Sequence, residues 1–150
     1  MATKRVRRKP VVQVKRLLPS SPEDVFDAWL DPNRLKEWLC PGSAIVPLAE
    51  IDARIGGRFR IVMRDEGVDY THVGEYREIA RPRRLVFSWA SPATKGQNTL
   101  VTIEFRARGE STELTLTHER LPDKDTADKH KRGWQSIMEK LAHYRDEARS

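Results

Sequence analysis

The amino-acid sequence predicts an α+β fold in which a curved antiparallel sheet packs against a long C-terminal helix. The predicted elements follow one another as a strand, two short helices, a run of five or six strands and a final helix. Strands and helices do not alternate as βαβ units, which disfavours a doubly wound parallel sheet. The final helix carries an apolar stripe that must be buried, and the sheet is the only large apolar surface available to it.

The first strand and the two short helices occupy the first third of the chain. Residues 11–18 alternate in part between apolar and polar side chains, which predicts a strand. The Ser-Pro pair at 21–22 is typical of a helix N-cap followed by the first helical position. The Asp-Pro pair at 31–32 starts a second short helix, and the Pro-Gly pair at 41–42 ends it.

The signals between residues 44 and 118 are almost all those of antiparallel strands. Pro47 interrupts the first of these segments, which predicts an edge strand or a bulge at that position. The short sequences IGG, DEG, ARPR and GE separate the later segments and predict turns. The run as a whole predicts a sheet of sequential hairpins.

The last segment, from about residue 123, is predicted to form one long helix. His130, Trp134, Ile137 and Leu141 lie along one stripe, with Met138 beside it. Gly133 interrupts this pattern, and a glycine inside a helix costs about 1 kcal/mol relative to alanine. We therefore expect either a close approach of another segment to the backbone at Gly133 or a bend of the helix over a cavity.

Composition limits the class of protein. The 150 residues are 38% hydrophobic and 33% charged, which is typical of a soluble globular protein. No stretch approaches the roughly 18 apolar residues needed to span a bilayer, so no membrane contact is expected. The N-terminus lacks the apolar core of a secretory signal peptide. Cys40 is the only cysteine, which excludes an internal disulfide and indicates a cytoplasmic location.

The net charge of +6 is concentrated at the N-terminus. Five of the first nine residues are Lys or Arg, and the remainder of the chain carries 23 basic and 22 acidic residues. We expect residues 1–10 to form a flexible basic tail and residues 11–150 to form a single domain, as a monomer or a homodimer. Binding of nucleic acid is not expected, because no element that reads bases accompanies the tail.

One face of the predicted sheet and the stripe of the final helix supply a candidate ligand pocket. On the last strand Leu116 and His118 share a face, while Glu119 points to the other. The candidate ligand-binding residues are Trp38, Phe59, Ile61, Met63, Phe87, Trp89, Ile103, Leu116, His118, Trp134, Met138 and Leu141. Such a set suits an apolar cavity with a few polar groups that orient a ligand. The pattern also allows the alternative that these side chains pack together and leave no space.

Signatures of catalysis and metal binding are missing from the sequence. It contains no HExxH, no paired cysteine and histidine spacing, no glycine-rich phosphate loop and no GxSxG elbow. His118 is the one candidate for general acid–base catalysis, but the sequence places no carboxylate beside it. His72 and Tyr76 share a strand face and are expected to be structural. We expect no catalytic residue, no metal and no cofactor.

Five stretches, in their order and spacing, resemble a known family. They are SPEDVFDAWLDPNRLKEWLCPG, GGRFRI, GEYREIARPRRLVFSW, VTIEFRARGESTELTLTHERLPD and HKRGWQSIMEKLAHY, and the resemblance extends over roughly residues 11–147. The chain resembles the START-like, helix-grip superfamily called SRPBCC, in the branch related to the C-terminal domain of the activator of the ninety-kilodalton heat-shock chaperone's ATPase. The resemblance implies a seven-stranded sheet that grips the C-terminal helix, a cavity between them, and a Trp38 that closes one end.

The expected function is non-catalytic binding or sensing of a small hydrophobic or aromatic ligand, because the resemblance favours a cavity over complete packing. Two alternatives stay open. The first is an enzyme similar to the polyketide cyclases, which would use His118. The second is an interaction protein of the stress response that resembles the chaperone ATPase activator.

Overall fold

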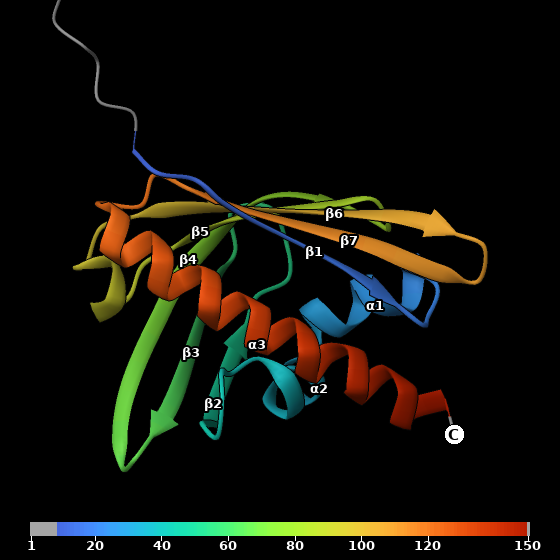
Figure 1. The fold of residues 1–150 in the computed structure, drawn as a ribbon, viewed down its shortest axis with the longest axis horizontal. Helices are drawn as coiled ribbons and strands as arrows, with labels where there is room; N and C mark the ends of the chain where they lie inside the picture. The colour runs from blue at the N-terminus through green and yellow to red at the C-terminus, as the bar shows by residue number, and fades with distance from the viewer. Residues whose placement is uncertain (1–8, 150) are drawn as a thin grey trace, which may run out of the picture.

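A curled antiparallel sheet and the helices that it holds make up the molecule (Figure 1). The structure is a computed structural model that describes residues 9–149, with side chains up to residue 144. Most of the tail expected over residues 1–10 therefore lies outside the described residues. The elements are β1 (Val12–Leu18), α1 (Pro22–Leu30), α2 (Pro32–Trp38), β2 (Ile45–Ile51), β3 (Arg58–Asp65), β4 (Val68–Ala80), β5 (Arg84–Trp89), the 3-10 helix η1 (Pro92–Thr94), β6 (Thr99–Arg108), β7 (Ser111–Glu119) and α3 (Lys124–Arg149). The predicted α+β class is confirmed.

The seven strands form one sheet in the order β1-β7-β6-β5-β4-β3-β2. All neighbouring strands are antiparallel, and only the β1–β7 pair joins strands that are far apart in the sequence. The long strand β4 has a register shift between Tyr76 and Glu78, which lets its first part pair with β3 and its second part with β5. The sheet thereby curls, and α3 runs across its concave side (Figure 1).

The strand β2 is an edge of the sheet, as Pro47 predicts. Its pairing with β3 shifts between Ile45 and Leu48, so Pro47 lies within the irregular part of the strand. Proline has no N–H to donate to a sheet ladder, and a bulge on an edge strand is the place where that loss is tolerated. A bulge of this kind also discourages pairing with another chain.

The two short helices begin as their sequences predict. The Ser21 hydroxyl accepts a hydrogen bond from the Asp24 N–H at 3.2 Å and caps α1. The Asp31 carboxylate accepts from the backbone N–H groups of Asn33 and Arg34 and caps α2. Each helix places a proline in its first turn, where a missing N–H costs nothing.

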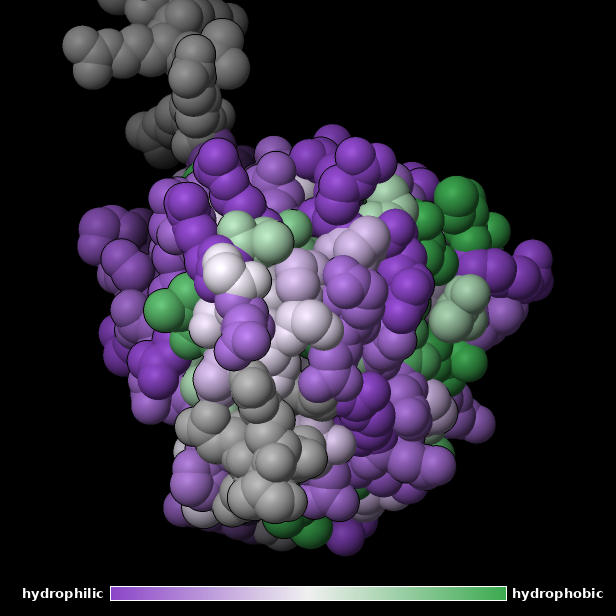
Figure 2. Space-filling model, turned by 90° about the vertical axis from the view of Figure 1, so that its right-hand side faces the viewer, coloured by the Kyte–Doolittle hydropathy of each residue, from purple (hydrophilic) through white to green (hydrophobic). Residues whose placement is uncertain are grey.

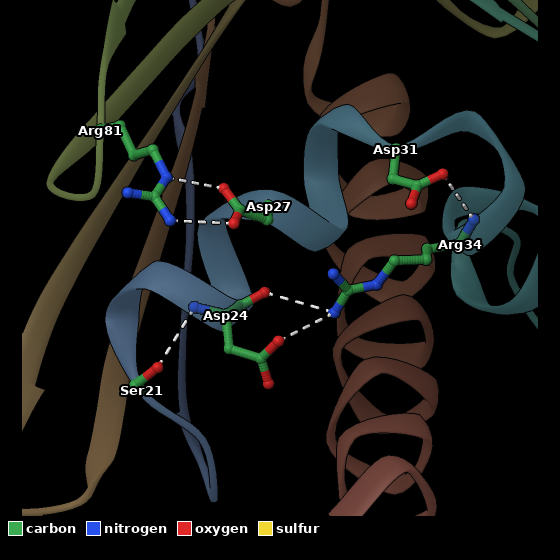
Figure 3. A network of polar contacts seen from close by, with 6 residues as sticks. All are labelled: Ser21, Asp24, Asp27, Asp31, Arg34 and Arg81. Atoms are coloured by element: carbon green, nitrogen blue, oxygen red, sulfur yellow. Dashed lines mark hydrogen bonds and ion pairs between the residues drawn. The ribbon is translucent and has the colours of Figure 1, made fainter.

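Ion pairs attach these helices to their surroundings (Figure 3). Arg81, in the turn between β4 and β5, donates two hydrogen bonds to the Asp27 carboxylate of α1, at 2.8 and 3.0 Å. Arg34 of α2 donates to the Asp24 carboxylate of α1 at 3.2 Å. Both pairs are partly exposed, so we assign them a role in orienting the helices rather than a large share of the stability.

A continuous hydrophobic cluster joins the inner face of the sheet to all three α-helices. It includes all four tryptophan residues, which are at most 3% exposed. The end of the molecule where α3 finishes is mostly hydrophilic, with hydrophobic side chains in separate patches toward the edge of the view (Figure 2). Among the described residues, no helix has the length and apolar character that crossing a bilayer requires.

Candidate functional site

A pocket opens between the first half of α3 and the strands β3, β4 and β5. Its volume is about 150 Å³. The lining residues are Pro41, Met63, His72, Trp89, Ala93, Lys129, His130, Gly133, Trp134 and Ile137. Met63, Trp89 and Trp134 are buried, whereas Ala93 and Lys129 are exposed and mark the side that faces solvent. The pocket is thus an apolar recess with a polar rim.

An isolated β-bridge sets the positions of His72 and Trp89 in this pocket. Val73 and Ala90 exchange two backbone hydrogen bonds of 2.9 Å each, and each residue directly follows one of the two rings in the sequence. The ring centroids of His72 and Trp89 lie 4.9 Å apart at an interplanar angle of 42°. A fixed backbone on both sides therefore holds a histidine ring against an indole ring.

The four tryptophans form one connected aromatic cluster beside the pocket. The ring of Trp134 on α3 lies 5.3 Å from that of Trp89 and 6.4 Å from that of Trp29 on α1. Trp29 in turn contacts Trp38 of α2 edge-on at 4.6 Å. These distances are typical of favourable aromatic pairs. The cluster connects both short helices to the pocket wall.

His118 occupies the inner face of β7, as the strand pattern predicts, and is completely buried. The Trp134 Nε1–H donates to His118 Nδ1 at 3.0 Å. His118 Nε2 lies 2.6 Å from the Thr99 hydroxyl, which also lies 2.6 Å from the Trp89 carbonyl oxygen. An indole N–H only donates and a carbonyl oxygen only accepts. The chain of bonds therefore requires that Nε2 carries the proton, donates to Thr99, and leaves Nδ1 as an acceptor.

This arrangement makes His118 a structural group. Both of its ring nitrogens are occupied, and it lines neither this pocket nor the smaller void described below. Burial, followed by the proximity of His130, lowers the pKa of His118 to about 3. A second proton on the ring would face the donor of Trp134, so the neutral form is the one that fits.

Two polar side chains stand at the rim of the pocket. His130 Nδ1 lies 2.8 Å from the Thr126 carbonyl oxygen, so Nδ1 carries the hydrogen and donates it. Burial lowers the pKa of His130. Lys129 forms an exposed ion pair with Asp125, one helical turn earlier, at 3.2 Å. The rim therefore contributes a neutral imidazole and an ammonium group that already has a partner.

Four buried side-chain nitrogen atoms have no hydrogen-bond partner among the described residues: Trp29 Nε1, Trp38 Nε1, Trp89 Nε1 and His72 Nδ1. Leaving such a buried group unpaired costs about 1–3 kcal/mol. Two of the four belong to side chains that line the pocket, His72 and Trp89. His72 is 8% exposed and Trp89 is 3% exposed, so bulk water does not compensate them. Burial lowers the pKa of His72 to about 4, although hydrogen bonds between its ring and the backbone of Ile61 and Tyr70 act in the opposite direction, so the ring is neutral at physiological pH.

Gly133 contributes open space to this pocket. A Cβ atom built on Gly133 would meet no heavy atom within 4 Å, and the residue lies on the pocket wall. The expectation that another segment approaches the backbone closely at this position is therefore wrong. The helix α3 continues from Lys124 to Arg149 through the glycine without interruption.

The structure distributes the predicted ligand-binding residues over three environments. Met63, Trp89 and Trp134 line the pocket. Phe59, Ile61 and Phe87 line, together with Trp89, a void of only about 10 Å³. The other six, Trp38, Ile103, Leu116, His118, Met138 and Leu141, are buried in the core and line neither space. The centre of the helix–sheet contact is thus packed, and the open space lies to one side of it. The ligand-binding role of these residues stays a prediction.

Several lining residues are missing from the sequence-based set. The helical periodicity places His130 and Ile137 on the apolar stripe, and the strand pattern places His72 on a face shared with Tyr76. The sequence therefore indicated the positions of these three residues, although the predicted set omits them. Gly133 carried a signal as well, because a glycine inside the helical pattern allows a bend over a cavity. Pro41, Ala93 and Lys129 carried none, because they reach the pocket from loops and a helix position that only the tertiary structure brings together.

A wider hollow of about 770 Å³ lies on the outer face of the sheet. Half of its lining residues are charged, and they include Arg58, Arg60, Glu50 and Glu75. None of the four unpartnered nitrogen atoms belongs to its lining. In the part of the chain that the structure describes, no group of three or more His, Cys, Asp or Glu side chains could hold a metal ion. The smaller inner pocket is the better candidate site, because buried aromatic and apolar side chains line it.

Comparison with known families gives one match that spans most of the chain. The family model described as Activator of Hsp90 ATPase homolog 1-like protein matches residues 19–146. No curated protein matches the chain.

Solved structures share the fold closely. A crystal structure of a protein from Chromobacterium violaceum is 26% identical, covers 89% of this chain and 96% of its own, and superposes with a TM-score of 0.81. An AHSA1 protein from Silicibacter pomeroyi, also 26% identical with the same coverage, has a TM-score of 0.75. A protein from Nitrosomonas europaea at 22% identity, covering 93% of this chain and 96% of its own, has a TM-score of 0.80 and shares the fold.

Proposed function

The chain belongs to the family of Activator of Hsp90 ATPase homolog 1-like proteins, within the SRPBCC helix-grip superfamily, and on this basis we propose that it binds a small hydrophobic or aromatic ligand without converting it. The ligand occupies the pocket between the sheet and the first half of α3. The single observation that supports this proposal is a recess of about 150 Å³ whose buried wall is aromatic and apolar. We assign the binding to the cytoplasm, in keeping with the single cysteine, Cys40.

The volume of the pocket limits the size of the ligand. An apolar protein cavity of roughly 150 Å³ accepts a benzene molecule. The rings of Trp89 and Trp134 offer flat surfaces on which another ring can pack. A compound with one aromatic ring fits this space, whereas a multi-ring polyketide exceeds it.

Turnover has no support from the site. His118, the candidate for acid–base catalysis, uses both ring nitrogens for hydrogen bonds to Thr99 and Trp134. His130 lies at the rim and donates its Nδ1 proton to a backbone carbonyl. The cyclase-like alternative that relies on His118 is therefore not carried further. The alternative of a chaperone partner rests on the family description alone, and no feature of the pocket favours it.

A side chain added at Gly133 tests the proposal, because that position has free space next to the pocket. We expect Gly133→Leu to weaken the binding of toluene at least tenfold, since the leucine side chain competes for the recess. The measurement is a titration of the full chain followed by isothermal calorimetry and by NMR shifts of the tryptophan indole N–H groups.

The matched control is Gln135→Leu, which adds the same side chain at an exposed position of α3 outside the pocket. It should bind toluene as the unaltered chain does. Equal toluene affinity in a folded Gly133→Leu variant, or no binding by the unaltered chain, would contradict the proposal.

A further inference from the structure

His130, at the rim of the pocket, has one ring nitrogen that no other described residue contacts by a hydrogen bond. Its Nδ1 lies 2.8 Å from the Thr126 carbonyl oxygen, whereas its Nε2 has no hydrogen-bond partner among the described residues. From this arrangement we infer that the pocket selects a single-ring compound with an O–H or N–H group, which donates a hydrogen bond to His130 Nε2. The inference rests on the proposed ligand-binding function and names the residue that orients the ligand.

The contact with the helix backbone fixes which nitrogen of His130 accepts. A carbonyl oxygen only accepts, so the bond to Thr126 requires a hydrogen on Nδ1. In a neutral imidazole the other nitrogen then carries a lone pair and no hydrogen. Burial lowers the pKa of His130, although the bond to Thr126 acts in the opposite direction, and the neutral form is favoured. Nε2 is therefore an acceptor, and its partner must be a donor.

A ligand can reach this acceptor. The unpartnered nitrogen atoms of His72 and Trp89 are sealed inside the protein, whereas His130 Nε2, which is also unpartnered, keeps exposed surface. The ring of His130 packs at 89° against that of His118, with 5.0 Å between the centroids. His118 does not line the pocket, so it supports the His130 ring from the core. The backbone bond and this ring contact together hold Nε2 in a defined position.

The rest of the lining determines which way the ligand points. Met63, Trp134 and Ile137 are apolar and at most 6% exposed. A ring that packs on them directs its polar group away from the core, toward the rim where His130 lies. At the rim the polar group keeps part of its contact with water, so its desolvation costs little. The hydrogen bond to His130 then adds selectivity without the burial of an unpaired polar group.

Lys129, the other polar side chain at the rim, favours a different ligand. Its ammonium group only donates, so it would select an acceptor such as a nitrile or a carboxylate. Lys129 is exposed and already pairs with Asp125 at 3.2 Å. An exposed ammonium group with a partner contributes little to binding. The partly buried His130, with an unused acceptor, is therefore the group that sets the preference.

The test compares four probes on the full chain by isothermal calorimetry at neutral pH. Phenol and aniline donate a hydrogen bond, benzonitrile only accepts one, and toluene does neither. Because the probes differ in hydration, the informative quantity is the change in each affinity that a substitution causes. His130→Phe keeps an aromatic ring and removes the acceptor. We expect phenol and aniline to bind this variant about fivefold more weakly, and toluene and benzonitrile to change by less than about twofold.

The matched control is His143→Phe, which makes the same exchange at an exposed position of α3 outside the pocket. It should leave all four affinities unchanged.

NMR of the imidazole nitrogen atoms tests the inference on the unaltered chain, so it stands even if His130→Phe fails to fold. The free protein should show a hydrogen on His130 Nδ1 and none on Nε2. Phenol should shift the Nε2 resonance because it donates to that atom, whereas toluene should leave the resonance in place. A hydrogen on Nε2 in the free protein would overturn the inference.

The outcomes separate this inference from the proposed function. If His130→Phe weakens toluene as much as phenol, or weakens neither, selection of a donor is wrong while ligand binding in the pocket stands. If benzonitrile is the probe that loses most affinity, His130 donates instead of accepting and the inference is wrong. If none of the four probes binds, the proposed function and this inference fail together.

Discussion

Two histidine residues show how the same side chain serves different purposes in one core. His118 has a partner at each nitrogen, Trp134 at Nδ1 and Thr99 at Nε2. His72 is also buried, and its Nδ1 has no hydrogen-bond partner among the described residues. The strand pattern predicts that His118 faces inward, yet it cannot identify Thr99 and Trp134 as partners, because they come from β6 and α3. The two histidine residues therefore differ in the partners of their Nδ1 atoms rather than in burial.

The burial of His118 leads us to predict how the free energy of unfolding depends on pH. The pKa of His118 in the folded chain, about 3, lies below the ordinary value of 6.5. Between these two pH values the unfolded chain binds a proton at His118 and the folded chain does not. The free energy of unfolding therefore falls as the pH drops from 6.5 toward 3. We expect His118→Gln to reduce the loss between pH 7 and pH 5 by about 2 kcal/mol.

The measurement is urea denaturation at a series of pH values for both proteins. His72 and His130 remain in the variant and have lowered pKa values, so some acid sensitivity persists. An equal loss of stability in the two proteins over this pH range would show that His118 does not contribute.

A second prediction at the residue scale concerns the stability of a Gly133 variant. Because a Cβ atom there meets nothing within 4 Å, Gly133→Ala should gain helix propensity without a clash. We expect the free energy of unfolding to rise by about 0.5–1 kcal/mol, measured by thermal or urea denaturation. A loss of stability would mean that the helix requires a conformation that alanine resists.

At the scale of elements, the path of β4 decides where the pocket lies. The strand leaves β3 and joins β5 at the register shift between Tyr76 and Glu78, and the Val73–Ala90 bridge holds the crossing. The sequence predicts a strand here but gives no sign of the shift, because a bulge depends on the pairing of two strands. The edge position of β2 was predictable, since Pro47 marks it directly. A residue with a restricted backbone, such as proline, can be interpreted from the sequence alone. A shift in strand register cannot, because it depends on both strands of the pair.

Gly74, beside this crossing, is a position where a side chain has no room. A Cβ atom on Gly74 would lie 1.9 Å from the Ser88 carbonyl oxygen and 2.4 Å from the Phe59 ring. We expect Gly74→Ala to lower the free energy of unfolding by about 1–3 kcal/mol or more, because β4 must move away from β5. Urea denaturation measures the change, and Gly133→Ala is the matched control with the opposite expected sign. Unchanged stability would indicate that the two strands separate readily at this point.

At the scale of the molecule, the fold was predictable and the position of the cavity was not. The element order, the long amphipathic helix and the family resemblance together indicate the curled sheet around α3. The predicted pocket set assumes that all inward side chains surround one central space. The six of them that line neither space, with Leu116 and Leu141 as examples, pack closely in the core instead. Whether side chains on facing elements meet or leave a gap depends on sheet curvature and helix distance, which periodicity does not encode.

The linked tryptophans have a consequence for how this protein interacts with light. Four indole chromophores in a series of contacts between 4.6 and 6.4 Å are close enough to share their electronic excitation. Excitation energy passes readily between rings at such separations, so we expect the emission to report on the cluster as well as on single rings. We expect a ligand that contacts Trp89 or Trp134 to change the fluorescence of the whole cluster, including Trp29 and Trp38. Intrinsic tryptophan fluorescence is therefore a natural probe of this pocket, from a cluster that extends from α2 to the pocket lining.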